Sequence, residues 1–266
     1  MFNGLANTDF TEPAYFLLLT SIFFGAVFFR YLFVSGVFHY VFYVLLRKQY
    51  QHRILNGDPK NKSQIKKEIY WSAITSLIFG VSGTLMIILW QKDYTGIYLD
   101  LDRYSFWYLP VSLFIVLFLH ETYYYWLHRW MHLPKVYHLM HKVHHDSIHT
   151  NSLTSFSFHP IESVAQAIII PLIVFFVPIH IYVLLVVLVI MTFSGTLNHA
   201  GVELFPEGFH QHWLGKWLIG ASHHDQHHKK FRFNYGLYFT FWDKWMGTEA
   251  DDYEVKFDRP VSDSKS

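Results

Sequence analysis

The chain has no cysteine among its 266 residues. Disulfides, thiolate metal sites, iron–sulfur clusters and cysteine nucleophiles are therefore all excluded. Any metal must be held by histidine or carboxylate side chains. Charged residues are also scarce, at 15%, and the formal net charge is only +1. A basic face of the kind that binds nucleic acid is therefore not expected.

The sequence is rich in apolar residues. The sequence is 52% hydrophobic and 20% aromatic, which is typical of an integral membrane protein. We expect one membrane domain over residues 1–266, all-α, with about four transmembrane helices and a histidine-rich cap. Residues 13–105 should form the N-terminal transmembrane helices and a basic loop.

The membrane helices can be placed from the apolar runs. The run from Pro13 to Leu46 is about 34 residues, or about 50 Å of helix against a hydrocarbon core of about 30 Å, so one tilted helix or a bent pair would both fit. Residues 70–90 supply a second crossing, and the run from Phe106 must return. The block 161–199 is broken by V-P-I-H at 177–180 and predicts a hairpin that spans the membrane or dips into it.

The loop over residues 47–68 sets the orientation. It carries seven Lys or Arg residues against two acidic ones, so the positive-inside rule places it in the cytoplasm. The helix from Phe106 returns to that side, and His128 lies about 33 Å along it, at the cytoplasmic edge. Residues after Ala200 should form a cytoplasmic cap, with a disordered tail at 257–266.

One histidine pattern occurs twice, as H-K-V-H-H at 141–145 and H-D-Q-H-H at 224–228. With 19 histidines in the chain, such a pattern is expected only about 0.1 times by chance. On a helix it places two imidazoles at i and i+4 on one face and a third at i+3. Neutral imidazole is the commonest metal ligand, so the repeat indicates a metal site.

The sequence H-R-W-M-H at 128–132 adds a third box. Eight histidines therefore lie in the three boxes, and because one metal rarely takes more than six ligands, they imply two metals. Imidazole suits zinc, copper, iron and nickel, so the ligand type alone does not choose among them. The expected ligands are His128, His132, His141, His144, His145, His224, His227 and His228.

An ordered set of motifs carries a family resemblance over residues 106–248. The segments are HETYYYWLHRWMH, HKVHHDS, SFHPIE, NHAGVELFP, SHHDQHHKKFRFNYGLYF and WDKWMGT. In this order they resemble the fatty acid hydroxylase and sterol desaturase superfamily of membrane proteins, and most closely its sterol desaturase-like branch.

The resemblance implies an enzyme whose two iron ions, held by histidines at the cytoplasmic membrane surface, use O2 as co-substrate to hydroxylate or desaturate a C–H of a lipid taken from the bilayer. No catalytic residue separate from the metal centre is implied. The chain has no haem or flavin motif, so electrons must come from a donor such as cytochrome b5, ferredoxin or a reductase.

Further residues near the boxes have expected roles. His199 is similar to a family histidine that completes the site; His223 is a ligand or a hydrogen-bond donor to one, and His120, inside an apolar span, is a ligand or hydrogen-bonded. Four residues are expected to support the ligands rather than bind metal. Glu121 would orient a ligand, Asp225 would anchor its helix, and His159 would brace a turn with Glu162.

Two other functions are compatible with histidine boxes: a histidine-lined metal transporter, and a zinc-dependent membrane hydrolase or zinc-stabilised fold. A transporter would place its ligands at mid-membrane, whereas these boxes follow the end of a span. A hydrolase of the H-E-x-x-H type lacks its motif here. The sequence leaves the lipid open among sterol, acyl chain and carotenoid-like molecules. The ending SDSKS lacks a double-lysine retrieval pattern, which favours a bacterial inner membrane over the endoplasmic reticulum.

Overall fold

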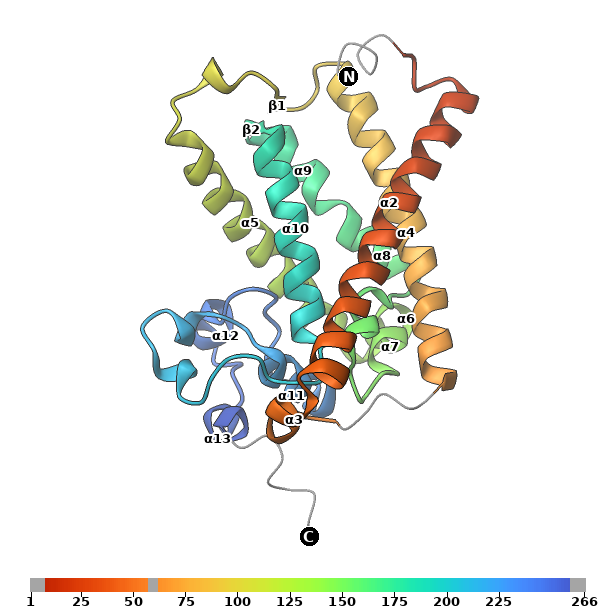
Figure 1. Ribbon diagram of the computed structural model, residues 1–266. Helices are drawn as coiled ribbons and strands as arrows, with labels where there is room; N and C mark the ends of the chain where they lie inside the picture. The colour runs from red at the N-terminus through yellow and green to blue at the C-terminus, as the bar shows by residue number, and fades with distance from the viewer. Residues whose placement is uncertain (1–7, 57–61, 259–266) are drawn as a thin grey trace.

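The computed structural model describes residues 8–56 and 62–258. Long helices form one end of the molecule, and short helices and loops gather at the other end (Figure 1). This division places apolar helices in one layer and the histidine boxes in the other.

The N-terminal apolar run forms one long helix rather than a bent pair. Helix α2 (Pro13–His39) continues directly into a π-helical segment, η1 (Tyr40–Leu45). Pro13 suits the first turn, where its missing N–H has no partner to lose. Two short elements follow, α3 (Arg47–Tyr50) and η2 (Gln51–Arg53).

Helix α4 (Lys62–Gln91) packs closely along α2 (Figure 1). The approach depends on Gly80, where a Cβ would lie 2.9 Å from the backbone nitrogen of Phe24. The hydroxyls of Thr20 and Thr84 also hydrogen-bond at 2.9 Å. Small residues and a buried hydroxyl pair are the usual means by which membrane helices associate.

The second half of the helical layer contains both helices and short elements. They are β1 (Ile97–Tyr98), η3 (Leu101–Arg103), α5 (Tyr108–Met131), α8 (Pro160–Ala167), α9 (Ile169–Phe176), β2 (Ile179–His180) and α10 (Ile181–Asn198). The expected hairpin is present, because α9 and α10 are joined at Val177 and Pro178. Strands β1 and β2 pair in parallel, with Ile97 opposite Ile179.

Among the described residues, three helices are long and apolar enough to cross a membrane: 13–45, 62–91 and 181–198. The first arm of the hairpin, Pro160–Phe176, is shorter. Helix α5 covers the expected return from Phe106, but it is not among these three, so its crossing of the membrane stays a prediction. Large side chains such as Phe29 and Phe33 point outward and are 69% and 59% exposed, as expected where lipid replaces water. The prediction of an all-α membrane protein is confirmed.

The cap is built from short elements around the ends of α5 and α10 (Figure 1). They are α6 (Pro134–Met140), α7 (Lys142–His145), η4 (Ser152–Phe156), η5 (Phe209–Gln211), η6 (Gly215–Trp217), α11 (Ala221–Lys230), α12 (Phe241–Trp245) and α13 (Tyr253–Asp258).

The expected tail at 257–266 begins too early. Phe257 and Asp258 belong to α13, and Phe257 is only 1% exposed. Arg53 donates a hydrogen bond to the Phe257 carbonyl at 2.9 Å, which the sequence does not reveal because the two residues are far apart in the chain. Residues 259–266 lie outside the described part of the chain.

One acidic residue of the basic loop has an unexpected position. Glu68 lies in α4 and is 1% exposed. Its carboxylate accepts hydrogen bonds from Ser147 (2.7 Å), Thr154 (2.8 Å) and Asn151 (2.9 Å). A buried carboxylate is tolerated when several donors satisfy it, so Glu68 ties α4 to the segment that follows the first box.

Candidate metal centre

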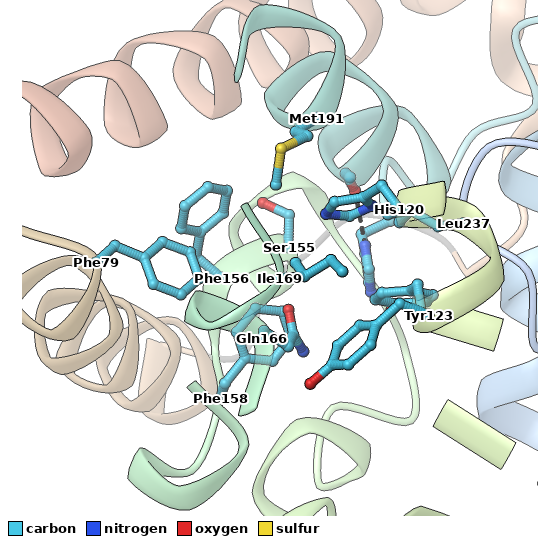
Figure 2. A pocket seen from close by; sticks show the side chains of 13 residues that line it. Phe79, His120, Tyr123, Ser155, Phe156, Phe158, Gln166, Ile169, Met191 and Leu237 are labelled. Atoms are coloured by element: carbon cyan, nitrogen blue, oxygen red, sulfur yellow. Dashed lines mark hydrogen bonds between the residues drawn. The ribbon is translucent and has the colours of Figure 1, made fainter. Parts of the chain in front are cut away.

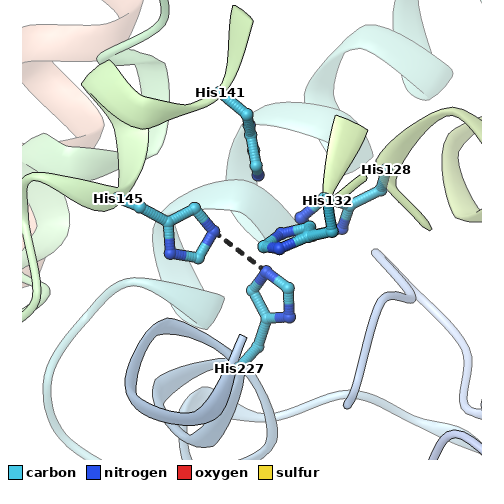
Figure 3. A group of neighbouring side chains, drawn as sticks. All are labelled: His128, His132, His141, His145 and His227. Carbon is cyan, nitrogen blue, oxygen red and sulfur yellow. Dashed lines mark hydrogen bonds between the residues drawn. The ribbon is translucent and has the colours of Figure 1, made fainter. Parts of the chain in front are cut away.

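The histidine boxes converge into two groups of side chains. In each group the nearest ring nitrogens all lie within 4.8 Å of one another. The five-histidine group contains His128, His132, His141, His145 and His227 (Figure 3). The four-histidine group contains His144, His199, His224 and His228.

Helix geometry explains why each H-x-x-H-H contributes to both groups. At about 100° per residue, position i+4 lies about 40° to one side of position i, and i+3 about 60° to the other. The first box sends His141 and His145 to the five-histidine group and His144 to the other. The second box does the reverse, with His224 and His228 in the four-histidine group and His227 in the other.

The ends of α5 and α10 that lie near the cap supply the remaining histidines of the two groups. His128 lies in the last turn of α5, and His132 is the residue that caps its end, so both reach the five-histidine group. His199 directly follows α10 and joins the four-histidine group. All eight box histidines and His199 are therefore brought together.

Backbone carbonyls orient several of these rings. The Nδ1 atoms of His128, His199 and His227 lie 2.8, 2.7 and 2.7 Å from the carbonyl oxygens of Tyr235, Gly195 and Phe233, respectively. A carbonyl oxygen can only accept, so in each neutral ring Nδ1 carries the hydrogen and Nε2 carries a lone pair. That lone pair points into the group.

A carboxylate does the same for His141. Its Nδ1 lies 2.8 Å from Oε1 of Glu162, and both side chains are fully buried. Glu162 also accepts a hydrogen bond from Nε2 of Gln166 at 3.0 Å. Carboxylate–histidine pairs of this kind fix the tautomer and raise the basicity of a metal-binding ring.

The ring nitrogens inside the groups fit a bound cation. Nε2 of His199 lies 3.1 Å from Nε2 of His144 and 2.9 Å from that of His224, although its own proton is on Nδ1. Other Nε2 atoms, those of His128, His132, His141 and His228, are buried with no hydrogen-bond partner among the described residues. Converging lone pairs repel one another unless a positive charge lies between them, so the donor set suits histidine-bound metals.

The environment keeps the cap histidines neutral. Burial, and then the neighbouring histidines His199 and His228, hold the pKa of His224 well below its usual range. The pKa of His145 is lowered in the same way by burial and then by His228. Neutral imidazole is the form that binds metal, so these rings need no deprotonation at neutral pH.

Two expected ligands lie outside both groups. His120 is two turns before His128 on α5, and its Nδ1 lies 3.2 Å from the hydroxyl of Tyr238. His223 is fully buried on α11, with Nε2 3.9 Å from Oδ2 of Asp243. It directly precedes a box histidine, so the helical rotation of about 100° turns it away from the groups.

Three of the expected supporting residues act on backbone or on other partners. Glu121 accepts hydrogen bonds from the N–H groups of Leu237 and Tyr238 at 2.9 and 2.7 Å, and so holds the loop rather than a ligand ring. Asp225 accepts from Asn56 at 2.6 Å and pairs with Lys229 at 2.7 Å.

His159 does not pair with Glu162. Instead it caps the start of α8, where Nδ1 accepts a hydrogen bond from the Ile161 N–H at 3.3 Å. Glu162 is thereby left to His141. The reason is geometric, because a side chain at a helix start faces the free N–H groups of the first turn.

The loop at 233–236 carries two functional groups that were not predicted from the sequence. They are the backbone carbonyls of Phe233 and Tyr235, which orient His227 and His128. Asp243 holds this loop by accepting from the N–H groups of Tyr235 and Gly236, both at 2.9 Å. Asn234 adopts a left-handed conformation, with φ of 61°, and donates to the carbonyl of His223 at 2.8 Å. The N-Y-G sequence is the one local signal of this turn, since backbone acceptors have no side-chain signature.

A largely apolar cavity (Figure 2) is lined by His199, a member of the four-histidine group. We call it the inner cavity. Its volume is about 60 Å³, and its polar lining residues include His120 and His199. Ser155, Gln166 and Gly195 also line it, and aromatic and aliphatic side chains form most of the wall: Phe79, Tyr123, Tyr124, Phe156, Phe158, Ile169, Met191 and Leu237.

Comparison with known proteins identifies the family. The sequence model of the fatty acid hydroxylase family matches residues 113–248, just over half of the chain. The chain therefore belongs to the fatty acid hydroxylase family. No solved structure gives a significant match to the chain.

The similar curated proteins include a sterol desaturase and a lathosterol oxidase. A Delta(7)-sterol 5(6)-desaturase of Gibberella zeae is 28% identical over 226 residues, 85% of this chain and 66% of the relative. The lathosterol oxidase of Homo sapiens is 27% identical over 215 residues, 80% of this chain and 70% of the relative. The chain thus spans about two thirds of the length of these relatives.

These matches confirm the resemblance to the fatty acid hydroxylase and sterol desaturase superfamily and to its sterol desaturase-like branch. They do not support the expected bacterial inner membrane, because these relatives come from a fungus and a mammal.

Proposed function

We propose that the chain is an O2-dependent oxidoreductase that hydroxylates or desaturates a sterol or fatty acyl C–H at a histidine-bound di-iron centre. The observation that carries this proposal is the convergence of nine imidazoles into two adjoining groups, with an apolar cavity ending at His199. A pair of irons, when bound, would supply activation of O2 and removal of hydrogen from an unactivated C–H.

The two histidine groups would each bind one of the two metals. The five-histidine group would bind one metal with five imidazoles, and the four-histidine group the other with four, which leaves more room for non-protein ligands. His199 belongs to the four-histidine group and also lines the inner cavity, so the lipid would approach this group. The apolar wall excludes water from the reacting carbon.

The lipid can approach from the bilayer through adjoining spaces. An outer groove of about 410 Å³ lies between α4 and α8–α9 and is lined by exposed residues such as Leu85 and Phe175. The outer groove shares Ser82, Met86, Ala167 and Pro171 with a middle cavity of about 140 Å³. The middle cavity in turn shares Phe79, Gln166 and Met191 with the inner cavity.

The same layout supports a cytoplasmic orientation of the metal centre. The basic elements α3 and the start of α4 lie at the histidine end of the molecule (Figure 1), so the positive-inside rule favours a cytoplasmic metal centre. The two electrons would come from an external donor such as cytochrome b5, ferredoxin or a reductase.

The two alternative functions fit less well. A metal carrier needs ligands along a mid-membrane path, whereas both histidine groups lie at the cap ends of α5 and α10. A zinc hydrolase needs a carboxylate base beside the metal, whereas the two groups found among the described residues contain only histidine.

The test is metal content and O2 consumption of the purified chain. We expect about two irons per chain, and lipid oxidation that needs O2 and an electron donor. His227→Ala and His144→Ala remove a ligand from the five- and the four-histidine group, respectively. Each should lower the iron content and abolish turnover, whereas His212→Ala, an exposed histidine outside both groups, should change neither. Full iron content and turnover in either ligand variant would refute the proposal.

A further inference from the structure

The middle cavity contains a charged side chain that has no counter-ion among the described residues. Phe23, Val27 and Arg30 line it from α2, at spacings of four and three residues that place all three on one helix face. The other walls come from α4, α8, α9 and α10. Arg30 is the one charged residue among the lining residues.

Arg30 lies near the middle of a membrane helix. It is about 25 Å from the start of α2 and about 22 Å from the end of η1 at 1.5 Å per residue. A guanidinium at this depth is costly, and such residues pair with an acceptor or face a cavity that serves a function. Arginine stays protonated and offers five donors and no acceptor.

Among the described residues, none pairs with the charge of Arg30. Nε of Arg30 is buried without a hydrogen-bond partner, and no acidic side chain pairs with Arg30 within residues 8–56 and 62–258. The other polar side chains of the middle cavity are engaged elsewhere: the Ser82 hydroxyl donates to the Ala167 carbonyl at 3.1 Å, and Gln166 donates to Glu162 at 3.0 Å. A molecule in the middle cavity that carries an oxygen acceptor would pair with this guanidinium.

We propose that Arg30 binds the oxygen-bearing end of the lipid substrate, a hydroxyl or a carboxylate, and so fixes how deeply the lipid enters. This rests on the proposed function, because it takes the lipid of that reaction as the occupant. A lipid that enters by the outer groove reaches the middle cavity, where Arg30 lies, before the inner cavity and His199. The inner cavity, at about 60 Å³, holds only part of such a molecule. The anchored oxygen thus selects which carbon lies against the four-histidine group.

Equilibrium binding tests this inference without turnover. Tritiated lathosterol and stearate are each compared with the matched hydrocarbon that lacks the oxygen, using iron-loaded protein in detergent without an electron donor. We expect one oxygen-bearing lipid to bind about 10-fold more tightly than its hydrocarbon, as for a hydrogen bond to a charged group. A preference for lathosterol identifies a hydroxyl, and a preference for stearate identifies a carboxylate.

Three variants isolate the role of Arg30. Arg30→Met should erase the preference for the oxygen-bearing lipid, and Arg30→Lys, which keeps the charge but not the planar fork, should retain part of it. Val27→Ala, one turn away in the same cavity, should weaken the binding of the oxygen-bearing lipid and of the hydrocarbon equally. A wild-type chain with no preference, or an Arg30→Met variant with the wild-type preference, overturns the inference.

The outcome separates this inference from the proposed function. A preference that depends on Arg30, in a chain that consumes no O2, would leave the inference standing and refute the oxidation. O2-dependent lipid oxidation with an unchanged preference in Arg30→Met would refute the inference alone.

Discussion

Glu162 on α8 offers a sharp test of how the protein orients a metal ligand. Its Oε1 lies 2.8 Å from Nδ1 of His141, and both side chains are fully buried. Replacement by leucine removes the acceptor that keeps the proton on Nδ1 and the lone pair of Nε2 within the five-histidine group. Loss of such a partner typically weakens metal affinity about 10- to 100-fold, or about 1.4 to 2.7 kcal/mol. That range agrees with the roughly 1.5 to 3 kcal/mol of a hydrogen bond to a charged group.

The assay is an anaerobic titration of metal-free protein with Fe(II) against a chelator. For Glu162→Leu we expect one of two irons to bind 10- to 100-fold more weakly and the other to bind as in the wild type. Glu162→Gln keeps an acceptor oxygen and should lose less. Gln166→Leu removes the other hydrogen bond to Glu162 without touching His141, and it serves as the matched control. Two irons bound with wild-type affinity in Glu162→Leu would show that the carboxylate does not orient this ligand.

Two further predictions concern stability. Because burial holds the pKa of His224 and His228 well below the usual 6.5, the unfolded chain binds more protons than the folded one below that pH. Their contribution to stability is therefore complete above pH 6.5 and is lost as the pH falls, by up to about 1.4 kcal/mol per group and pH unit. The Tm of metal-free protein should fall when the pH is lowered from 7.5 to 5.5. A constant Tm over this range would contradict the lowered pKa values. Glu68→Ala leaves the donors of Ser147 and Asn151 buried without their acceptor, and should lower the free energy of unfolding by about 3 kcal/mol or more. Glu68→Gln should lower it less. An unchanged Tm in Glu68→Ala would show that these bonds contribute nothing to stability.

The sequence predicts the helical layer well because its signals are local. A helix that crosses the membrane needs only a sufficient apolar length, and the break at 177–180 ends one helix wherever the chain is placed. The same locality limits the prediction at Glu68. Its surroundings in sequence are basic and polar, whereas the donors that bury it come from residues 147–154.

For the metal centre, the eight box histidines can be found from the sequence, because i, i+3 and i+4 spacing fixes which rings share a helix face and the apolar spans end near the boxes. Tertiary packing was needed to show that each H-x-x-H-H box contributes to both groups, that His199 joins the smaller group, and that His120 and His223 join neither. It also decided which groups orient the rings, since the carbonyls of Gly195, Phe233 and Tyr235 carry no sequence signal. The physical reason is the same throughout: spacing along a helix fixes directions, but contact between four distant segments depends on how the whole chain packs.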